Sequence, residues 1–582
     1  MWIMPRFLLI FIILIISCDF DKSTTRTDFK TVFETSDGTE TATYQQTIQY
    51  YTDLADTYNE IHIREIGESD SGKPLHIVTL NPESEFDFDD IRENKKIILI
   101  NNGIHPGESD GIDATMMLFR DIVQGKIDVP KNTVLVTIPI YNIGGSLNRN
   151  STTRTNQNGP KEYGFRGNAR NFDLNRDFIK SDTKNARTFA QIYHLVKPDV
   201  FIDNHVSNGA DYQYAITHLF TQHNKLGGEL GEFLNSTMQP EIEKKMTEKG
   251  LDMTPYVNVF NDVPEKGFSQ YLDSPRYSTG YTSLFNTLGM MVETHMLKPY
   301  KQRVEATYEI MKSLLEFTEE HHETIAELRK DKWKQYEQFE TYPLSWEVDT
   351  TRSTTLKFKG YEGVFLKSEI TGGMRLKYDR NKPFTKAVVY QNYFKPSTSI
   401  TIPKAYVIPQ GWWNVIDLLK INSIEITQLE KDSTFNVESY KIVDYKTRTG
   451  AYEGHYPHYN TTVSTEIIPI KFIKGDFIVS TFQPGIRYLM ETLEPQAPDS
   501  FFNWNFFDPI LQRKEYFSPY VWEDKAKLML AQNPRLQIEF NLKKTYDQDF
   551  ANNWYAQLNW LHQKSEHYET SYLLYPVYRI MR

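Results

Sequence analysis

The chain contains a single cysteine among its 582 residues, and this count limits how the fold is held together and which metals it can bind. One cysteine excludes intramolecular disulfides, cysteine-rich zinc modules and iron–sulfur clusters. A chain of this length can bury large cores without such crosslinks, and roughly two to four domains of about 100–200 residues each are expected. Any bound metal must therefore be held by histidine and carboxylate side chains.

The charge balance argues against nucleic acid as a partner. The sequence has 65 Lys and Arg against 76 Asp and Glu, which gives a formal net charge of −11. Proteins that bind nucleic acid usually have a basic excess. Aromatic residues make up 14% of the chain, which predicts large packed cores or stacking surfaces.

The N-terminus has the pattern of an export signal over residues 1–17. One basic residue, Arg6, precedes the unbroken apolar run 7–16, which is too short to span a ~30 Å hydrocarbon layer as a helix. Residues 15–18 resemble a bacterial lipoprotein signal, in which a small residue precedes a cysteine that becomes lipidated. We therefore expect an exported protein, anchored to the membrane of the cell envelope by a lipid on Cys18 and facing the periplasm or the cell surface. An ordinary signal peptide and an uncleaved anchor are the alternatives.

The remaining sequence divides into a tether and two domains. Residues 18–43 are rich in Asp, Thr, Ser and Lys, which predicts a flexible tether. Residues 44–333 alternate between helical and strand patterns, which predicts an α/β sheet with helices on both faces. Residues 343–582 contain β-like runs punctuated by Pro and Gly, which predicts a mostly β domain with some helix near its end. The sequence assigns no role to this second domain.

The elements predicted in the first domain alternate along the chain. Helices are expected over 44–58, 110–123, 183–196 and 299–333, and strands over 61–66, 75–80, 97–100, 133–140, 200–202 and 290–292.

Candidate metal ligands follow two of these predicted strands. His105-Pro-Gly-Glu108 comes after strand 97–100, and His205 comes after strand 200–202. Because open α/β sheets form their sites at the carboxyl ends of strands, the three side chains can converge. Two imidazoles and one carboxylate make a zinc site with a fourth position open to water. A polar turn without metal and an ordinary loop histidine are the alternatives.

Glu293 is the candidate proton acceptor, because it directly follows the buried run 290–292. Zinc lowers the pKa of bound water, but a carboxylate must still take the proton. The alternative is a core carboxylate held in a salt bridge, since an unpaired buried glutamate is unfavourable.

The polar stretch 148–177 is rich in arginine. Arginine clamps a carboxylate through two parallel hydrogen bonds, so this stretch predicts recognition of a substrate carboxylate. A solvated loop with paired arginines is the alternative, and it fits Arg149 and Arg154 better than Arg176.

Together, the motifs resemble the zinc carboxypeptidase family, of which carboxypeptidase A is the familiar member, over about residues 44–324. The resemblance implies a mixed central sheet with helices on both faces, one Zn²⁺ ion, and hydrolysis of a C-terminal peptide bond. It implies that His105, Glu108 and His205 bind the zinc. It also implies that Glu293 is the general base that deprotonates the zinc-bound water.

The resemblance further implies a substrate-binding segment. Asn175 and Arg176 fall on the pair that holds the free C-terminal carboxylate of the substrate. Asp173 falls on the carboxylate that orients the first zinc histidine.

Two assignments within the resemblance stay open. Either Arg166 or Arg170 corresponds to the arginine that polarises the scissile carbonyl. The tyrosine that caps the substrate is one of Tyr271, Tyr277 and Tyr281.

Two other functions fit the same sequence. The zinc site is compatible with hydrolysis of peptidoglycan stem peptides in the envelope, or with removal of acyl groups from amino acids. A surface binding lipoprotein without catalysis is a further alternative, in which the second domain dominates. The presence of Glu293 beside all three ligands argues against that last possibility.

Overall fold

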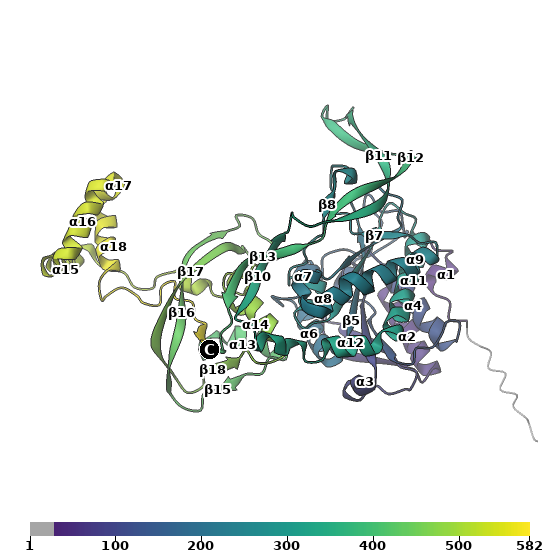
Figure 1. Cartoon of the computed structure of the whole chain (residues 1–582), viewed down its shortest axis with the longest axis horizontal. Helices are drawn as coiled ribbons and strands as arrows, with labels where there is room; N and C mark the ends of the chain where they lie inside the picture. Colours follow the sequence, from purple (N-terminus) through teal and green to yellow (C-terminus); the bar gives the residue numbers. More distant parts are fainter. Residues whose placement is uncertain (1–27) are drawn as a thin grey trace, which may run out of the picture.

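The computed structural model describes residues 28–582 (Figure 1). Cys18 and the export signal lie outside these described residues, so the lipid anchor stays a prediction. Among the helices of residues 28–582, none is both long enough and apolar enough to cross a membrane.

The predicted tether does not extend over residues 28–43, which pack onto the first domain. Helix α1 (Val32–Thr35) begins with a capping box formed by Thr31. Phe33 is buried, and its ring lies 5.8 Å from the ring of Tyr300. Thr31 and Thr43 cap helices, and Phe33 packs against the first domain. The average polar composition of the segment gives no sign of these specific contacts.

A mixed eight-stranded sheet forms the centre of the first domain. Its strands are β1 (Ile61–Glu68), β2 (Pro74–Leu80), β3 (Lys96–Asn101), β4 (Thr133–Ile138), β5 (Val200–Ser207), β6 (Ile216–Phe220), β7 (Met253–Pro255) and β9 (Leu288–His295). They lie in the order β1-β2-β4-β3-β5-β9-β6-β7. The inner strands β4, β3, β5 and β9 run parallel, whereas β2 and β6 join them antiparallel.

Helices cover this sheet on both faces. Every residue of β4 and β5 is buried, which requires cover above and below the sheet. Helix α4 contacts β5, and helix α11 contacts β9. Helix α6 contacts β1 and β2 at the edge of the sheet. The predicted α/β fold with a mixed sheet is therefore confirmed. The helices are α2 (Tyr44–Thr57), α3 (Phe88–Asn94), α4 (Asp110–Val123), α5 (Ile143–Leu147), α6 (Lys184–Val196), α7 (His223–Leu226), α8 (Gly228–Phe233), α9 (Gln239–Glu248), α10 (Ser278–Ser283), α11 (Tyr300–Glu320) and α12 (His322–Arg329).

The helix predicted over residues 299–333 is broken into α11 and α12. The break falls at His321, whose φ of −112° and ψ of 16° lie outside the helical range. The charged pattern continues across this residue, so the periodicity alone gives no sign of the break.

The C-terminal region is rich in β-structure, as predicted. Strands β11 and β12 form a long hairpin, and β12 also pairs with β8 of the first domain. A six-stranded sheet follows in the order β15-β18-β14-β19-β16-β17. The strands are β8 (Phe268–Ser269), β10 (Thr341–Val348), β11 (Thr354–Lys367), β12 (Met374–Gln391), β13 (Phe394–Thr401), β14 (Ala405–Ile408), β15 (Thr427–Gln428), β16 (Ser433–Thr447), β17 (His458–Phe472), β18 (Phe477–Ser480) and β19 (Tyr578–Ile580).

Helices near the end of the chain form an arm that projects away from the central sheet (Figure 1). These are α15 (Pro519–Gln532), α16 (Pro534–Tyr546), α17 (Gln548–Ala551) and α18 (Trp554–Gln563). Two further helices of the C-terminal region, α13 (Trp413–Ile421) and α14 (Ile486–Leu493), contact the first domain.

The C-terminal region and the first domain share one hydrophobic core. Arg487 on α14 is 1% exposed and reaches across this boundary. Its Nη1 donates to the carbonyl oxygen of Ser283 at 2.7 Å, and its Nη2 donates to that of Lys225 at 2.9 Å. A buried guanidinium of the C-terminal region thus donates to two carbonyl groups of the first domain.

Replacement of Arg487 by Met should destabilise the whole chain. The change removes the buried charged donor from the Ser283 and Lys225 carbonyl oxygens, which is expected to lower the free energy of unfolding by about 2–5 kcal/mol. Urea unfolding measures this quantity. Arg535→Ala is the control, because Arg535 is 91% exposed and should change stability by less than about 0.5 kcal/mol. Equal unfolding midpoints for both variants would contradict a structural role for Arg487.

Candidate active site

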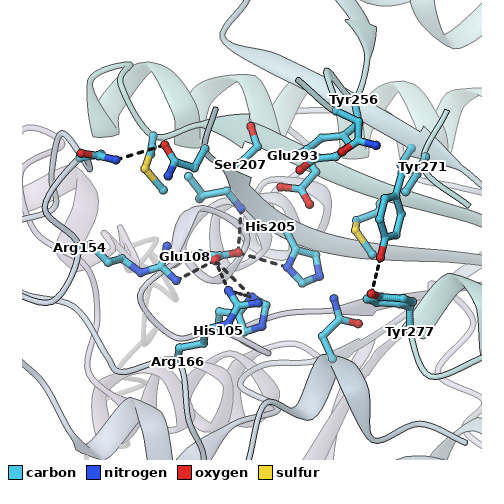
Figure 2. A pocket seen from close by; sticks show the side chains of 18 of the residues that line it. His105, Glu108, Arg154, Arg166, His205, Ser207, Tyr256, Tyr271, Tyr277 and Glu293 are labelled. Atoms are coloured by element: carbon cyan, nitrogen blue, oxygen red, sulfur yellow. Dashed lines mark hydrogen bonds and ion pairs between the residues drawn. The ribbon is translucent and has the colours of Figure 1, made fainter. Parts of the chain in front are cut away.

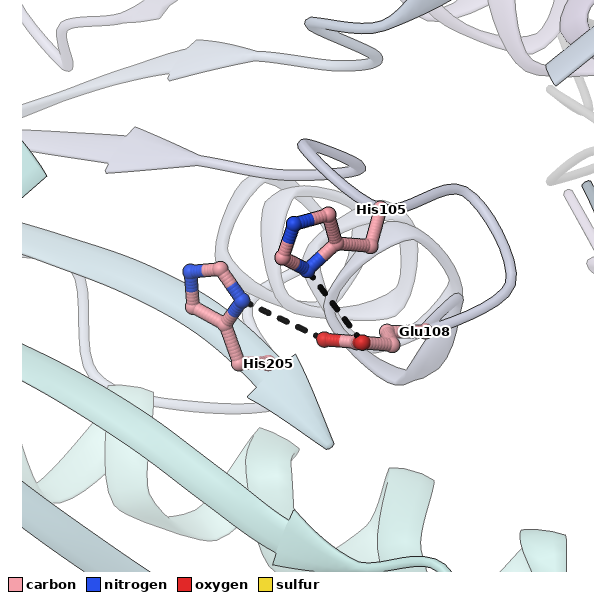
Figure 3. A group of neighbouring side chains, drawn as sticks. All are labelled: His105, Glu108 and His205. Carbon is pink, nitrogen blue, oxygen red and sulfur yellow. Dashed lines mark hydrogen bonds and ion pairs between the residues drawn. The ribbon is translucent and has the colours of Figure 1, made fainter. Parts of the chain in front are cut away.

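His105, Glu108 and His205 come together at the carboxyl edge of the central sheet. The first two lie in the loop between β3 and α4, and His205 lies on β5. Their side chains point toward one another (Figure 3). Nδ1 of His105 lies 3.2 Å from Glu108 Oε1, and Nδ1 of His205 lies 3.2 Å from Glu108 Oε2. One ligand atom from each residue falls within 4.8 Å of the others, and all three residues are buried.

The outer nitrogens of both histidines face carboxylates. Nε2 of His105 lies 2.9 Å from Asp173 Oδ1, and Nε2 of His205 lies 2.9 Å from Asp203 Oδ2. An imidazole that donates from Nε2 keeps a lone pair on Nδ1, so two lone pairs and the Glu108 carboxylate face a common point. Such a group repels itself unless a proton or a metal cation lies between its members. The donor set therefore fits zinc, which prefers nitrogen and carboxylate ligands.

Charge around the cluster favours the same conclusion. Burial alone would lower the pKa of His205, but the Asp203 carboxylate raises it well above its usual value. Burial would raise the pKa of Glu108, but the charges of His105 and Arg154 hold it well below its usual range. Glu108 is thus a buried carboxylate that the positive groups around it keep ionised.

Arg154 is part of this site, although its sequence context favours a solvated loop. Its Nη2 donates to Glu108 Oε1 at 2.7 Å, and its side chain is only 11% exposed. The contact requires a glycine at position 107, because a Cβ there would lie 2.2 Å from Arg154 Nε. The glycine of the His-Pro-Gly-Glu motif is the one local sign of this close approach.

Glu293 lies beside the cluster because of strand register. Strand β9 runs parallel to β5, with Glu293 opposite His205. Registered residues on neighbouring strands point to the same face of a sheet, so both side chains enter one pocket (Figure 2). Burial raises the pKa of Glu293 to about 8. The Glu108 carboxylate also raises this pKa, whereas the charge of His205 lowers it.

The structure separates the two candidate arginines. Arg166 lines the pocket, with its Nε donating to Asp173 Oδ2 at 3.0 Å and its Nη1 lying 3.4 Å from His105 Nδ1. Arg170 is not among the residues of 28–582 that line it, and is instead held away by the ring of Phe172 and the carbonyl oxygen of Asp182. Of these two candidates, Arg166 is therefore the one that lines the pocket.

Asp173 also organises the predicted carboxylate-binding pair. Its Oδ1 accepts a hydrogen bond from the backbone N–H of Asn175 at 2.9 Å, which caps the short helix Leu174–Arg176. The side chains of Asn175 and Arg176 both line the pocket. The Arg176 guanidinium stacks 4.6 Å above the ring of Tyr277. Burial would raise the pKa of Asp173, but the charges of His105 and the nearby arginines hold this pKa far below its usual value.

Of the three candidate tyrosines, Tyr271 and Tyr277 line the pocket, and their hydroxyl groups are hydrogen-bonded to each other (Figure 2). Tyr281 has no solvent exposure, and its hydroxyl donates to Asn422 at 2.5 Å. Tyr281 thus belongs to the core between the two domains and cannot cap a substrate.

Asp273 is a pocket residue that has no sequence motif to mark it. The pocket encloses about 660 Å³, and Asp273, Leu219 and Met291 are among the residues that line it. Asp273 is 1% exposed, and neither carboxylate oxygen has a hydrogen-bond partner among residues 28–582. Burial raises the pKa of Asp273 to about 6, while the charge of the Lys225 ammonium lowers it. The pocket is therefore lined by a buried carboxyl group.

The geometry defines a candidate metal site, and comparison with known proteins relates the chain to zinc carboxypeptidases. The zinc carboxypeptidase family model matches residues 47–201, which include His105 and Glu108. Carboxypeptidase 2 of Trichophyton rubrum is 20% identical over 487 residues, covering 80% of this chain and 84% of that protein. Carboxypeptidase 2 of Trichophyton equinum is 21% identical over 427 residues, covering 70% and 73%. The crystal structure of carboxypeptidase A from Helicoverpa armigera has a TM-score of 0.36 and 13% identity, covering 48% of this chain and 73% of that one.

The predicted resemblance to the zinc carboxypeptidase family is thus confirmed, and with it the prediction of a zinc metallopeptidase. The match ends at residue 201, so it does not include His205 or Glu293. Their place in the site comes from the register of β5 and β9.

Replacement of Asp173 by Asn should weaken zinc binding. The variant loses the negative charge beside His105 Nε2, and partners of this kind change metal affinity by about 10–100-fold. Competition with a fluorescent chelator measures the zinc dissociation constant. Asp524→Asn, on the exposed surface of α15, is the control and should bind zinc like the wild type. An unchanged zinc affinity in the Asp173 variant would show that this carboxylate does not support the metal site.

Proposed function

We propose that this chain hydrolyses the peptide bond that precedes a free C-terminal residue, with one zinc ion bound by His105, Glu108 and His205 and with Glu293 as the general base. The observation that carries the proposal is the shared pocket. The cluster, Glu293 and the Asn175–Arg176 pair all line it. A base and a carboxylate-binding pair beside a zinc site are the parts that such a reaction needs.

The pocket can hold a peptide at both ends of the scissile bond. Arg176 and Asn175 offer a guanidinium and an amide to the terminal carboxylate, which favours substrates with a free C-terminus. Arg166 lies beside His105 and offers N–H donors where negative charge develops on the carbonyl oxygen. Zinc bound by the three ligands supplies a Lewis acid that polarises the carbonyl and lowers the pKa of water.

Glu293 moves the proton in this proposal. Its carboxylate takes a proton from the attacking water and returns it to the leaving amine, so that the residue ends as it began. Its raised pKa suits this task, because a base works best when its pKa lies near the operating pH. A dication at the cluster would bring the value of about 8 down toward neutrality.

Glu293→Gln should abolish most of the hydrolysis while leaving zinc binding intact. Loss of a general base typically slows a reaction by about 10²–10⁴-fold. In the wild type, kcat/KM should rise with pH as Glu293 ionises, with an apparent pKa between 4.5 and about 8. Steady-state kinetics on a peptide with a free C-terminus, beside its C-terminal amide, measure both effects. Full activity in Glu293→Gln, or equal cleavage of the amide, would contradict the proposal.

The unpaired carboxylate of Asp273 bears on the preferred substrate. Once a terminal carboxylate is bound by Arg176, the C-terminal side chain would extend into the same pocket, which Leu219, Met291 and Asp273 also line. The two apolar side chains would contact an aliphatic stem, and the buried negative charge would pair with a cation at its end. The proposed function therefore includes a preference for a basic C-terminal residue.

Asp273→Asn should remove that preference. A hydrogen-bonded charge pair contributes about 1.5–3 kcal/mol, so kcat/KM for a peptide ending in Lys should fall by about 10–100-fold relative to one ending in Met. Product release followed by mass spectrometry gives both rates. Asp262→Asn, on the pocket's outer loop, is the matched control, because Asp262 pairs with Lys266 at the surface and should leave the ratio unchanged. A higher kcat/KM of the wild type for the Met peptide would refute this preference. An equal loss of kcat/KM on both peptides in Asp273→Asn would also refute it.

The alternative substrates of the same site are distinguished by the same assay. Peptidoglycan stem peptides and N-acyl amino acids also present a free carboxylate to Asn175 and Arg176. A panel that contains purified muropeptides and acyl amino acids shows which class is turned over fastest. Attachment to the envelope through Cys18 would place the enzyme near such peptides, and it remains part of the proposal.

A further inference from the structure

A turn of the C-terminal region contacts the segment that carries Asp173. The turn lies between β16 and β17 and includes Glu453 and Gly454. Oε2 of Glu453 accepts a hydrogen bond from the backbone N–H of Asp173 at 2.8 Å. Gly454 lies so close to Phe172 that a Cβ at this position would be 2.9 Å from the ring. Residues far apart in the sequence are therefore in direct contact beside the site.

A second contact from the same turn fixes the far end of this segment. Nε2 of His455 lies 2.7 Å from Asp182 Oδ2. Asp182 also accepts a hydrogen bond from Lys180 Nζ at 2.6 Å. The turn thus holds the substrate-binding segment on both sides of Asn175 and Arg176.

The backbone of the turn is unfavourable for a glutamate. Tyr452 and His455 exchange backbone hydrogen bonds of 2.8 and 3.1 Å, which closes a two-residue turn. The central residues Glu453 and Gly454 both have left-handed conformations, with φ of 48° and 80°. Turns of this kind favour Asn, Asp or Gly at the first central position. A glutamate kept in a strained conformation points to a task for its side chain, and its contact with Asp173 provides one.

Asp173 is the residue through which this contact reaches the site. Its carboxylate lies 2.9 Å from His105 Nε2, 3.0 Å from Arg166 Nε and 2.9 Å from the N–H of Asn175. A displacement of its main chain would therefore move a metal ligand, the carbonyl-binding arginine and the carboxylate-binding pair together.

The C-terminal region also supports the segment that precedes Tyr277. Nη2 of Arg276 lies 2.7 Å from Asp499 Oδ1, and its guanidinium stacks over Trp504 at 5.0 Å and Tyr452 at 5.7 Å. Trp504 is 1% exposed. Both segments that line the carboxylate side of the pocket are thus docked on the same part of the C-terminal region.

We propose that Glu453 is a positioning residue of the hydrolytic site, and that the C-terminal region serves catalysis by holding Asp173 in place. The inference rests on the proposed function for its kinetic consequence, but its structural consequence is independent of any substrate. The chain would then need its C-terminal region for correct site geometry and not only for stability.

Three variants of the full-length chain test the inference. Glu453→Gln keeps an oxygen that accepts the hydrogen bond from Asp173. Glu453→Gly removes that acceptor but fits the left-handed backbone without strain, so the melting temperature should be equal or higher. Glu466→Ala changes an exposed glutamate on β17 of the same hairpin and is the matched control.

Three measurements follow for each variant. Hydrogen exchange of the metal-free protein reports protection of the Asp173 amide, chelator competition reports zinc affinity, and peptide hydrolysis reports kcat/KM. Glu453→Gly should lose protection at Asp173 and show a 10–100-fold loss in zinc affinity and kcat/KM. Glu453→Gln and Glu466→Ala should remain within about threefold of the wild type.

Several outcomes would overturn the inference. Wild-type protection and zinc affinity in Glu453→Gly would show that the contact positions nothing. An equal loss in Glu453→Gln would show that the hydrogen-bond acceptor is not the cause. If the wild type binds zinc but cleaves no peptide, the proposed function fails, while exchange and zinc affinity still decide the role of Glu453.

Discussion

The parallel pairing of β3, β5 and β9 is the constraint on which the site depends. It brings the loop after β3, with His105 and Glu108, to the same edge of the sheet as His205 on β5. It also sets Glu293 directly opposite His205. Because side chains alternate between the faces of a strand, a shift of β9 by one residue would turn Glu293 away from the pocket. The positions of the metal-binding and proton-accepting side chains therefore depend on the correct register of the buried sheet.

Buried charged groups are the second feature of the site, and one of them, Asp173, contacts the C-terminal region. Glu108 is paired with Arg154, and Asp173 is paired with His105 and Arg166, so that these carboxylates are compensated within the site. Asp173 is in turn held by the C-terminal region. The second domain, which has no evident role from its composition, thus adjoins the residues that would bind the substrate.

Much of the site could be predicted because its signals are local. The strand-turn-helix context of the His-Pro-Gly-Glu motif is contiguous, and the helix predicted over 110–123 has the bounds that α4 shows. Arg154, Asp273 and Glu453 were beyond prediction, because their importance arises from contacts with residues distant in the chain. Tyr281 differs from Tyr271 only in burial, which the fold decides and the spacing does not. Residues 28–43 are likewise held by contacts with residues distant in the chain, such as that of Phe33 with Tyr300.

Anomalous X-ray diffraction at the zinc edge, on crystals of the purified chain, tests the central claim most directly. We expect one zinc peak per chain, about 2.0–2.2 Å from Nδ1 of His105, from Nδ1 of His205 and from a carboxylate oxygen of Glu108. The Glu293 carboxylate should lie on the open side of the ion. A zinc-loaded crystal with no peak between these three residues, or with zinc bound through Nε2 of either histidine, would contradict the account.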